Sequence, residues 1–385
     1  MLLIALKMLV GDKAKYIGIL MGLCFATFII TQQAAILIGI MKRTYGFVTD
    51  VAQPDIWVMS PATQYIDDIQ GVTENCIYNV RSIEGIEWAV PISKNLVQAR
   101  LVSGYHQSCI LIGIDNSTLI GQPPLMLEGK IEDLRMPDAI IVNEIGAETR
   151  LAYPIEPSTS TVPLRVGDVI ELNDHRAYVA GICKTTRTFQ SQPVVYTTYE
   201  RADTFLYSPR YPVSFIVAKA KEGFEPSELC KVIRERTELA AFLAPEVKWQ
   251  TVVYYLRHTG IAVNFGTAIV LGFIIGVAIA GQTLYNFTIG NLPYFGTLKA
   301  MGADNSILMK MILLQAFFVS AVGWGIGMLA TTLIGFLSAN TDLAFNMPLY
   351  LYLLSFASIT LISLIVSFVC IRTVNKLDPA IVFKS

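Results

Sequence analysis

Apolar and charged residues are segregated along this chain. Four blocks contain no Asp, Glu, Lys or Arg: Tyr16–Met41, Thr259–Leu298, Met311–Thr341 and Leu343–Ile371. Each block exceeds the roughly 18 apolar residues that indicate a membrane-spanning helix. A helix satisfies its own backbone hydrogen bonds inside lipid, which a spanning segment must do. The pattern therefore predicts an α-helical membrane protein with four transmembrane helices in the lipid bilayer.

The polar segment between the first and second blocks is long enough to fold as a domain of its own. The first block is too long for a signal-peptide core, so we interpret it as a retained anchor. The expected order is an amphipathic cytoplasmic interfacial helix at 1–15, spans at 16–41, 259–287, 307–337 and 349–371, a large domain at 42–258, a turn at 288–306, a short outer loop at 338–348 and a tail at 372–385.

The segment 42–258 alternates between short apolar runs and turn-forming residues, which predicts an α+β domain. Strand-like and helix-like segments fill about 47–125 and return at about 191–258, whereas 126–190 is richer in β-forming and Pro residues. We therefore expect one lobe that is interrupted by a β-rich insertion. The expected elements are strands at Asp55–Ser60, Val97–Val102, Ser108–Asp115 and Ser214–Ala218, helices at Glu74–Ile86 and Pro226–Leu239, and a hairpin around Asn173 and Asp174.

The second block is far longer than one span, so its C-terminal part must leave the membrane. Gly290, Asn291 and Pro293 interrupt the helix there, and Gly296 and Gly302 frame a short amphipathic piece. A small helix at the membrane surface between two spans is a place where another protein can hold a permease. The alternative is an ordinary loop between two helices.

Three of the four predicted spans contain two glycines separated by three residues. Such a face allows a second helix to approach closely, either within a bundle or across a dimer. The pairs are Gly18 and Gly22, Gly272 and Gly276, and Gly323 and Gly327.

The distribution of basic residues predicts the orientation in the membrane. Lys and Arg flank the N-terminal side of the first block, the turn at 288–306 and the C-terminal tail, whereas 338–349 carries only Asp342. Because basic residues mark the cytoplasmic side, both termini and the turn are expected in the cytoplasm and the large domain outside it. Lys42 and Arg43 lie on the other side, but long translocated domains largely escape this rule.

Composition and motifs exclude several classes of function. A net charge of −1 with only 15% charged residues gives no sign of nucleic-acid binding. The chain has no GxxxxGK(S/T) phosphate-binding loop, no HExxH or GxSxG motif and no Cys-x-x-Cys pair, so we expect no catalytic residue, metal site or bound cofactor. None of the four uncharged blocks contains an ionised residue, which argues against an ion-coupled carrier. The sequence does not decide whether any two of Cys76, Cys109, Cys183 and Cys230 form a disulfide outside the cytoplasm.

Three segments resemble the permease subunits of MacB/FtsX-like (type VII) ABC transporters. FGTLKAMGA at Phe295–Ala303 is similar to the family's cytoplasmic coupling motif, and KLDPA at Lys376–Ala380 to its (K/R)LDPA hallmark after the fourth span. VGDVIELNDHRAYVAGICK at Val166–Lys184 resembles the hairpin of its outer domain. The layout of four spans with a large domain after the first covers the whole chain. The length of the chain most resembles that of the DevC-type members. One departure is Tyr294, which stands where the family usually has an acidic residue.

The resemblance implies a homodimeric permease of the bacterial inner (cytoplasmic) membrane that is bound to a separate cytoplasmic ABC ATPase. ATP and Mg²⁺ would then bind to the partner, and a periplasmic membrane-fusion (adaptor) protein would dock on porter-like (47–125 and 191–258) and Sabre-like (126–190) lobes. The implied ATPase-coupling residues are Tyr294, Phe295, Gly296, Leu298, Lys299, Ala300, Gly302, Lys376, Asp378 and Pro379.

Three functions agree with these features. The first is ATP-driven mechanotransmission or efflux of a lipid, glycolipid, peptide or similar substrate. The second is an FtsX-like regulator that controls an extracytoplasmic enzyme and transports nothing. The third is a membrane-anchored binding protein without an ATPase. A co-purifying adaptor would favour the first function, a hydrolase the second, and the absence of any nucleotide-binding subunit the third.

Overall fold

The computed structural model describes residues 2–101, 104–154, 161–206, 213–338 and 341–375. Contacts divide the chain into two compact units, the first made of Met1–Ile40 and Gly260–Ser385 and the second of Met41–Thr259. We call the first the membrane unit and the second the α/β unit.

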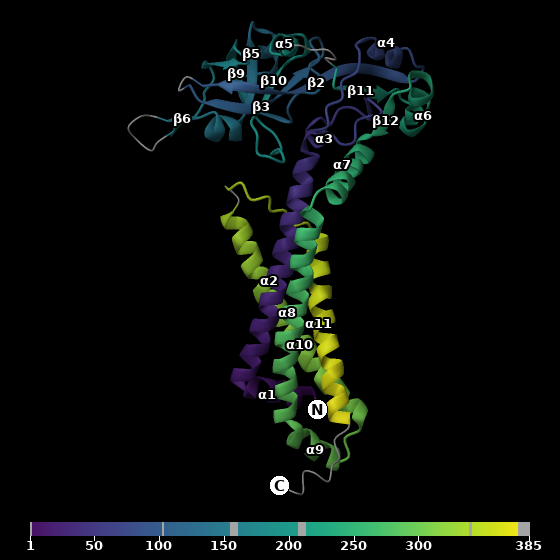
Figure 1. The fold of residues 1–385 in the computed structure, drawn as a ribbon. Helices are drawn as coiled ribbons and strands as arrows, with labels where there is room; N and C mark the ends of the chain where they lie inside the picture. The colour runs from purple at the N-terminus through teal and green to yellow at the C-terminus, as the bar shows by residue number, and fades with distance from the viewer. Residues whose placement is uncertain (1, 102–103, 155–160, 207–212, 339–340, 376–385) are drawn as a thin grey trace. The chain divides into compact units, whose positions relative to one another are not determined.

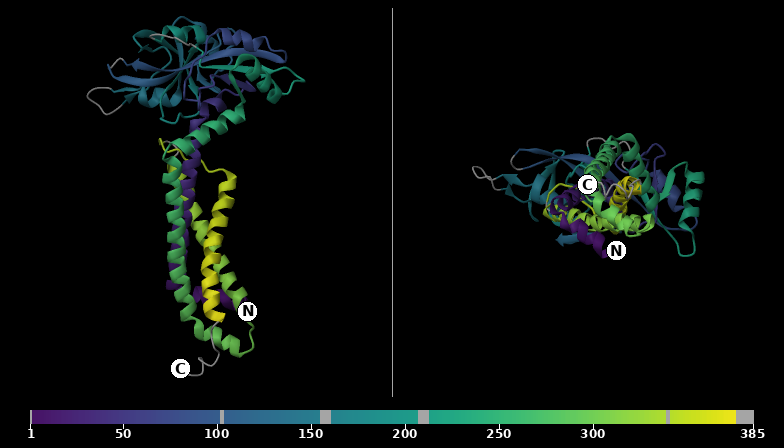
Figure 2. Two further views of the ribbon diagram at one scale, coloured as in Figure 1. Left: turned by 45° about the vertical axis from the view of Figure 1, so that its right-hand side comes forward. Right: turned by 90° about the horizontal axis from the view of Figure 1, so that it is seen from below.

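The membrane unit is built on four long helices that lie side by side (Figures 1 and 2). All four are long and apolar enough to cross a membrane, which confirms the predicted number of spans. The first of them extends beyond the uncharged block at both ends, because its terminal lysines can reach toward lipid headgroups. The four are α2 (Lys13–Thr44), α8 (Ile261–Gly290), α10 (Asn305–Leu337) and α11 (Leu349–Asn375), joined by the short helices α1 (Leu2–Gly11) and α9 (Leu292–Ala300).

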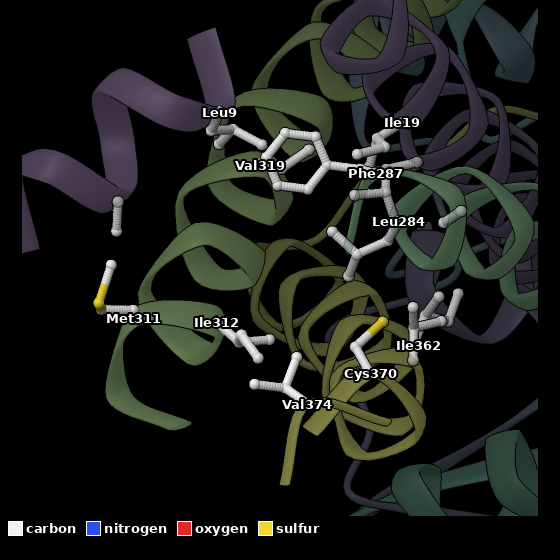
Figure 3. Packing of buried hydrophobic residues seen from close by; sticks show 14 of the residues in the cluster. Leu9, Ile19, Leu284, Phe287, Met311, Ile312, Val319, Ile362, Cys370 and Val374 are labelled. Carbon is white, nitrogen blue, oxygen red and sulfur yellow. The ribbon is translucent and has the colours of Figure 1, made fainter. Parts of the chain in front are cut away.

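One apolar cluster contains buried side chains from each of these helices. Figure 3 shows part of it, including Ile19 of α2, Phe287 of α8, Val319 of α10 and Ile362 of α11. The cluster also includes Leu9 of the short N-terminal helix. The two short helices are therefore packed into the bundle core and do not lie apart from it.

The predicted glycine pairs face neighbouring helices of the same chain. A Cβ atom on Gly22 of α2 would lie 2.7 Å from Ile279 Cγ2 of α8. A Cβ atom on Gly276 would lie 2.6 Å from Ala26 Cβ of α2. Because such distances are shorter than a van der Waals contact, these helices approach as closely as they do only where a side chain is missing. Gly18, Gly272, Gly323 and Gly327 lie against Thr283, Ile29, Leu23 and Thr27 in the same way.

The α/β unit is organised by one sheet, ordered β12-β1-β11-β2-β3-β10-β5-β9-β4, with β8 paired to β2 and β9. Helices pack against it and fill three apolar clusters. This mixed α/β domain lies in the sequence between the first and second spans, as predicted. Its strands are β1 (Ile56–Met59), β2 (Ile86–Arg100), β3 (His106–Ile114), β4 (Leu125–Glu128), β5 (Ala139–Asn143), β8 (Val169–Leu172), β9 (His175–Lys184), β10 (Val194–Thr198), β11 (Phe215–Ala220) and β12 (Ala240–Leu243), with the separate pair β6 (Tyr153–Pro154) and β7 (Thr161–Val162). Its helices are α3 (Gly46–Asp50), α4 (Asn75–Arg81), α5 (Tyr199–Thr204), α6 (Pro226–Thr237) and α7 (Ala244–His258), with a 3₁₀ turn η1 (Ile131–Arg135) and a π turn η2 (Gly146–Arg150).

The expected insertion at 126–190 does not form a sheet of its own. Its strand β5 pairs with β10, and its strand β8 pairs with the end of β2. The long strand β2 also pairs with β11 along its first half and with β3 along its second half, so it belongs to both halves of the sheet. The two expected lobes therefore share a continuous backbone hydrogen-bond network.

The hairpin predicted around Asn173 and Asp174 is formed by β8 and β9. Both turn residues have positive φ, 46° and 65°, as a two-residue type I′ turn requires. Asn and Asp tolerate this conformation better than other non-glycine residues. The Asn173 side chain also donates a hydrogen bond to the Phe205 carbonyl oxygen at 2.8 Å, which fixes the hairpin against the segment after α5.

The strand β2 carries a lysine into the interior of the α/β unit. Lys94 is 3% exposed, and its ammonium forms an ion pair with Asp67 and lies 4.8 Å from the centroid of the Phe47 ring. A buried cation destabilises a fold unless it is paired and hydrogen-bonded. Lys94 Nζ satisfies this condition by also donating to the Ile66 carbonyl oxygen at 3.2 Å.

All six cysteines are free thiols, so none of the candidate disulfides forms in this structure. Burial raises the pKa of Cys109 and of Cys183 to about 12, and that of Cys230 to about 11. In the unfolded chain these thiols ionise near pH 9, whereas the folded protein keeps them protonated. The unfolded state therefore binds fewer protons than the native state above pH 9.

We expect the free energy of unfolding of the α/β unit to fall as the pH rises above 9. Each of the three thiols contributes up to about 1.4 kcal/mol per pH unit, and the contribution is fully present below pH 9. Urea unfolding of the full chain in detergent, followed by tryptophan fluorescence from pH 8 to 10, measures this slope. The double variant Cys109→Ala, Cys183→Ala should be less stable at pH 8 but should show a shallower slope. An identical slope in both proteins would contradict the attribution of this pH dependence to the buried thiols.

Candidate coupling site between the second and third spans

The site begins where α8 ends. Asn291 follows Gly290, is 9% exposed, and donates a hydrogen bond from its side-chain amide to the Phe287 carbonyl oxygen at 2.8 Å. The Asn291 backbone N–H also bonds to the last turn of α8, and its carbonyl oxygen accepts from the Phe295 N–H at 3.1 Å. Asn291 thus closes α8 and opens α9. Pro293 lies in the first turn of α9, where its missing N–H costs nothing.

The other end of α9 is closed by a Schellman motif. The Gly302 N–H bonds to the Lys299 carbonyl oxygen at 3.1 Å, and the Ala303 N–H bonds to the Leu298 carbonyl oxygen at 3.0 Å. Gly302 has a φ of +95°, which a residue with a Cβ atom rarely adopts. Leu298 and Ala303, each 8% exposed, supply the apolar contact that usually accompanies this motif. Gly302 is therefore required by the turn itself.

The next helix starts immediately after this motif. Asp304 precedes α10 and accepts a hydrogen bond from Ser306 Oγ at 2.9 Å. The Ser306 hydroxyl, together with backbone N–H groups at the helix start, lowers the pKa of Asp304. A carboxylate at this position also interacts favourably with the positive end of the helix dipole. The turn from α8 through α9 to α10 is thus defined by local hydrogen bonds along its whole length.

The two faces of α9 differ in what they contact. Phe295 is fully buried and Leu298 nearly so, and both belong to the apolar cluster of the bundle. Tyr294 and Met301 lie on the opposite face and are 63% and 70% exposed. Pro293, Thr297 and Ala300 are also exposed, so the outer face is a stripe of uncharged residues at helical spacing. We call Tyr294, Thr297 and Met301 the outer stripe of α9.

The helix α1 supports this end of the bundle from another side. Ala5 and Leu9 are fully buried, and α1 packs against α10. Gln315 of α10 is 1% exposed and donates a hydrogen bond from Nε2 to the Ala5 carbonyl oxygen at 2.7 Å. A buried amide of this kind must find a partner, and here it ties α1 to the third span.

The residues predicted for coupling fall into three groups in the structure. Phe295, Gly296 and Leu298 are buried, Tyr294, Ala300 and Gly302 are exposed, and Lys299 is half-buried. Lys376, Asp378 and Pro379 lie outside the described residues. Prediction from the sequence missed Met301 of the outer stripe and the roles of Asn291 and Asp304. Asp followed by Asn-Ser before an apolar run is a recognisable helix start and could have identified Asp304.

Among the described residues, no three His, Cys, Asp or Glu side chains are grouped closely enough to hold a metal ion. The expectation that ATP and Mg²⁺ bind to a partner protein stays a prediction. The site offers a short helix with Lys299 in its last turn, an uncharged outer stripe, and an inner face that is part of the bundle core.

The match to one family model agrees with the sequence resemblance. Residues 266–379 match the family described as FtsX-like permease C-terminal, a range that includes α9 and most of the last three spans. The solved extracellular domain of the noncanonic ABC-type transporter YknZ from Gram-positive bacteria is 15% identical, with a TM-score of 0.34 over 49% of this chain and 98% of that chain. The periplasmic region of MacB from Actinobacillus actinomycetemcomitans is 12% identical, with a TM-score of 0.38 over 52% of this chain and 94% of that chain. No curated protein sequence matches the chain.

The fold and the site define a multi-pass membrane protein with a mixed α/β domain between its first two spans. Residues 266–379 match the FtsX-like permease C-terminal family, and this range contains the turn at 288–306. The DevC subtype stays a prediction.

Proposed function

We propose that this chain is the transmembrane subunit of an ATP-driven ABC complex, and that α9 receives the movement of a separate cytoplasmic ATPase. The family match of residues 266–379 carries this proposal. The packing of α9 supports it, because a displacement of Phe295 and Leu298 must move the side chains of α8 and α10 around them. Protein interiors are close-packed and transmit such a displacement.

The proposed function is mechanotransmission to the α/β unit, with efflux of a lipid, glycolipid, peptide or similar substrate through an adaptor protein. The working unit is a homodimer in the inner membrane of a bacterium. The alternative of an FtsX-like regulator uses the same coupling helix, so the two differ only in the partner outside the cytoplasm. Affinity purification that returns an adaptor supports efflux, and purification that returns a hydrolase supports regulation.

The coupling proposal is tested by Lys299→Glu in the full complex. Lys299 is the half-buried basic residue in the last turn of α9, and reversing its charge changes the electrostatics of this helix end. We expect ATP hydrolysis by the partner to lose its stimulation by this chain while the melting temperature is preserved. Lys221→Glu, an exposed charge reversal in the α/β unit, is the matched control. Full stimulation with Lys299→Glu, or purification without any nucleotide-hydrolysing subunit, would overturn the proposal.

The orientation is a separate prediction, tested by labelling introduced cysteines. Tyr105, at the turn before β3, and Met301 are similarly exposed, at 67% and 70%. In a Cys76→Ser background, we expect a membrane-impermeant maleimide to label Tyr105→Cys in intact spheroplasts and Met301→Cys only after lysis. The remaining cysteines are buried or lie in a span, so they give little background. Labelling with the opposite sidedness would place the α/β unit in the cytoplasm and contradict the topology.

A further inference from the structure

A groove of about 580 Å³ lies between α8 and α11 on the surface of the membrane unit. Both helices are spanning helices and pack against each other, as their parallel course in Figure 2 also shows. The upper wall of the groove is apolar and includes Val277 of α8 with Ile365 and Val369 of α11. A cavity of this size and lining is large enough for part of a lipid-sized ligand.

Polar groups also line this groove. Gln282 and Tyr285 contribute an amide and a hydroxyl from α8, and Arg372 and Thr373 contribute a guanidinium and a hydroxyl from α11. Tyr285 is eight residues beyond Val277, so these two lining residues are about 12 Å apart along α8. Arg372 directly follows the uncharged block that ends at Ile371, which puts its charge at the level of the membrane interface.

The guanidinium of Arg372 has a defined position. Its central carbon lies 4.4 Å from the centroid of the Phe368 ring, one turn earlier on α11. A cation stacked on an aromatic face loses part of its freedom, so it can hold a ligand with less entropic cost. Among the residues that line the groove there is one basic residue and no acidic one. The groove is therefore complementary to a ligand with an apolar chain and a negatively charged head.

We propose that this groove binds an acyl chain of an anionic phospholipid whose phosphate contacts Arg372. Basic pockets between spanning helices at the membrane surface are known to hold anionic headgroups. A second copy of the chain fits less well. A two-fold contact through this groove would place the Arg372 residues of both copies in one interface, where the groove offers no carboxylate to pair with them.

The proposal is tested by native mass spectrometry of the full chain in detergent micelles, titrated with phosphatidylglycerol or phosphatidylcholine of the same acyl composition. We expect tighter binding of phosphatidylglycerol to the wild-type protein. Arg372→Gln should weaken the binding of phosphatidylglycerol about fivefold and leave phosphatidylcholine unchanged, as expected for one basic residue at the membrane surface. Arg372→Lys should restore the preference. Lys310→Gln, which removes an exposed charge from α10 outside the groove, is the matched control.

A second variant fills the apolar part of the groove. A Cβ atom on Gly281 would lie 3.5 Å from Val366 Cγ2, an ordinary contact, so Gly281→Leu can be built without displacing the backbone. We expect it to weaken the binding of both lipids. Equal affinity for the two lipids in the wild-type protein, or unchanged phosphatidylglycerol binding with Arg372→Gln, would overturn the proposal. So would a Gly281→Leu protein that binds lipid normally but loses its dimer mass, because the groove would then be an interface between copies.

Discussion

Replacing Tyr294 and Met301 together by alanine is expected to reduce the affinity of the chain for its ATPase partner roughly tenfold or more. A hot-spot side chain at the centre of an interface contributes about 2 kcal/mol or more, and about 1.4 kcal/mol corresponds to a tenfold change in affinity. The two residues are the most exposed large side chains of α9 and the turn after it. Their removal takes away contact area but leaves the buried face of α9 intact.

The affinity is measured by titrating the purified ATPase against the full chain in nanodiscs, with ATP hydrolysis as a second readout. Tyr350→Ala is the control, because Tyr350 is 54% exposed in the first turn of α11, outside the turn that carries α9. We expect this control to bind the ATPase normally. If the double variant also binds with wild-type affinity, the outer stripe of α9 is not the contact surface. An effect of equal size in the Tyr350→Ala control would show a general loss of stability instead.

The sequence was sufficient to predict the spans and the break after the second one. Their charge-free blocks leave few alternatives, because a run of this length has to be a helix in lipid. Gly290, Asn291 and Pro293 marked the end of α8 correctly, and α9 starts within two residues of them. The pattern could not show that Asn291 would be buried or that the outer face of α9 would end in Met301. Both depend on how α9 docks against the bundle, which is tertiary packing.

The strand β2 shows why the continuous sheet was not predicted. Only its last four residues were expected in a strand, at Val97–Val102, although the strand runs from Ile86 to Arg100. Pro91 and Lys94 interrupt the alternation of apolar and polar residues in its first half. In the structure Lys94 is buried because Asp67 and the Ile66 carbonyl oxygen satisfy its charge. A partner so distant in sequence cannot be recognised from a local pattern.

The glycine pairs illustrate a different limit. Their spacing indicated close helix packing but did not identify the partner of each helix or distinguish a bundle from a dimer. In the structure α2 is the common partner, because the pairs of α8 and α10 both face it. The helix α2 therefore lies between two tightly packed neighbours. Any change that separates it from α10 should loosen the bundle without touching the coupling turn.

Gly327→Leu is expected to destabilise the bundle by about 3 kcal/mol, the upper part of the range for overpacked interiors. A Cβ atom at this position would lie 2.5 Å from Thr27 Cβ and 2.8 Å from the Cys24 carbonyl oxygen. One of these contacts is to backbone, so α2 itself must shift and no side chain can relieve the overlap by rotating. Reversible unfolding of the full chain in detergent micelles by increasing sodium dodecyl sulfate measures the loss.

Gly325→Leu is the matched control on the same helix, two residues away. A Cβ atom there would meet nothing within 4 Å, and the position is exposed on the surface of α10. Leucine also favours a helix over glycine by several tenths of a kcal/mol, so this variant should be at least as stable as the wild type. Equal destabilisation by both substitutions would mean that helix flexibility, and not the contact with α2, determines the stability. A large effect at position 327 alone would establish that the third span packs tightly on α2.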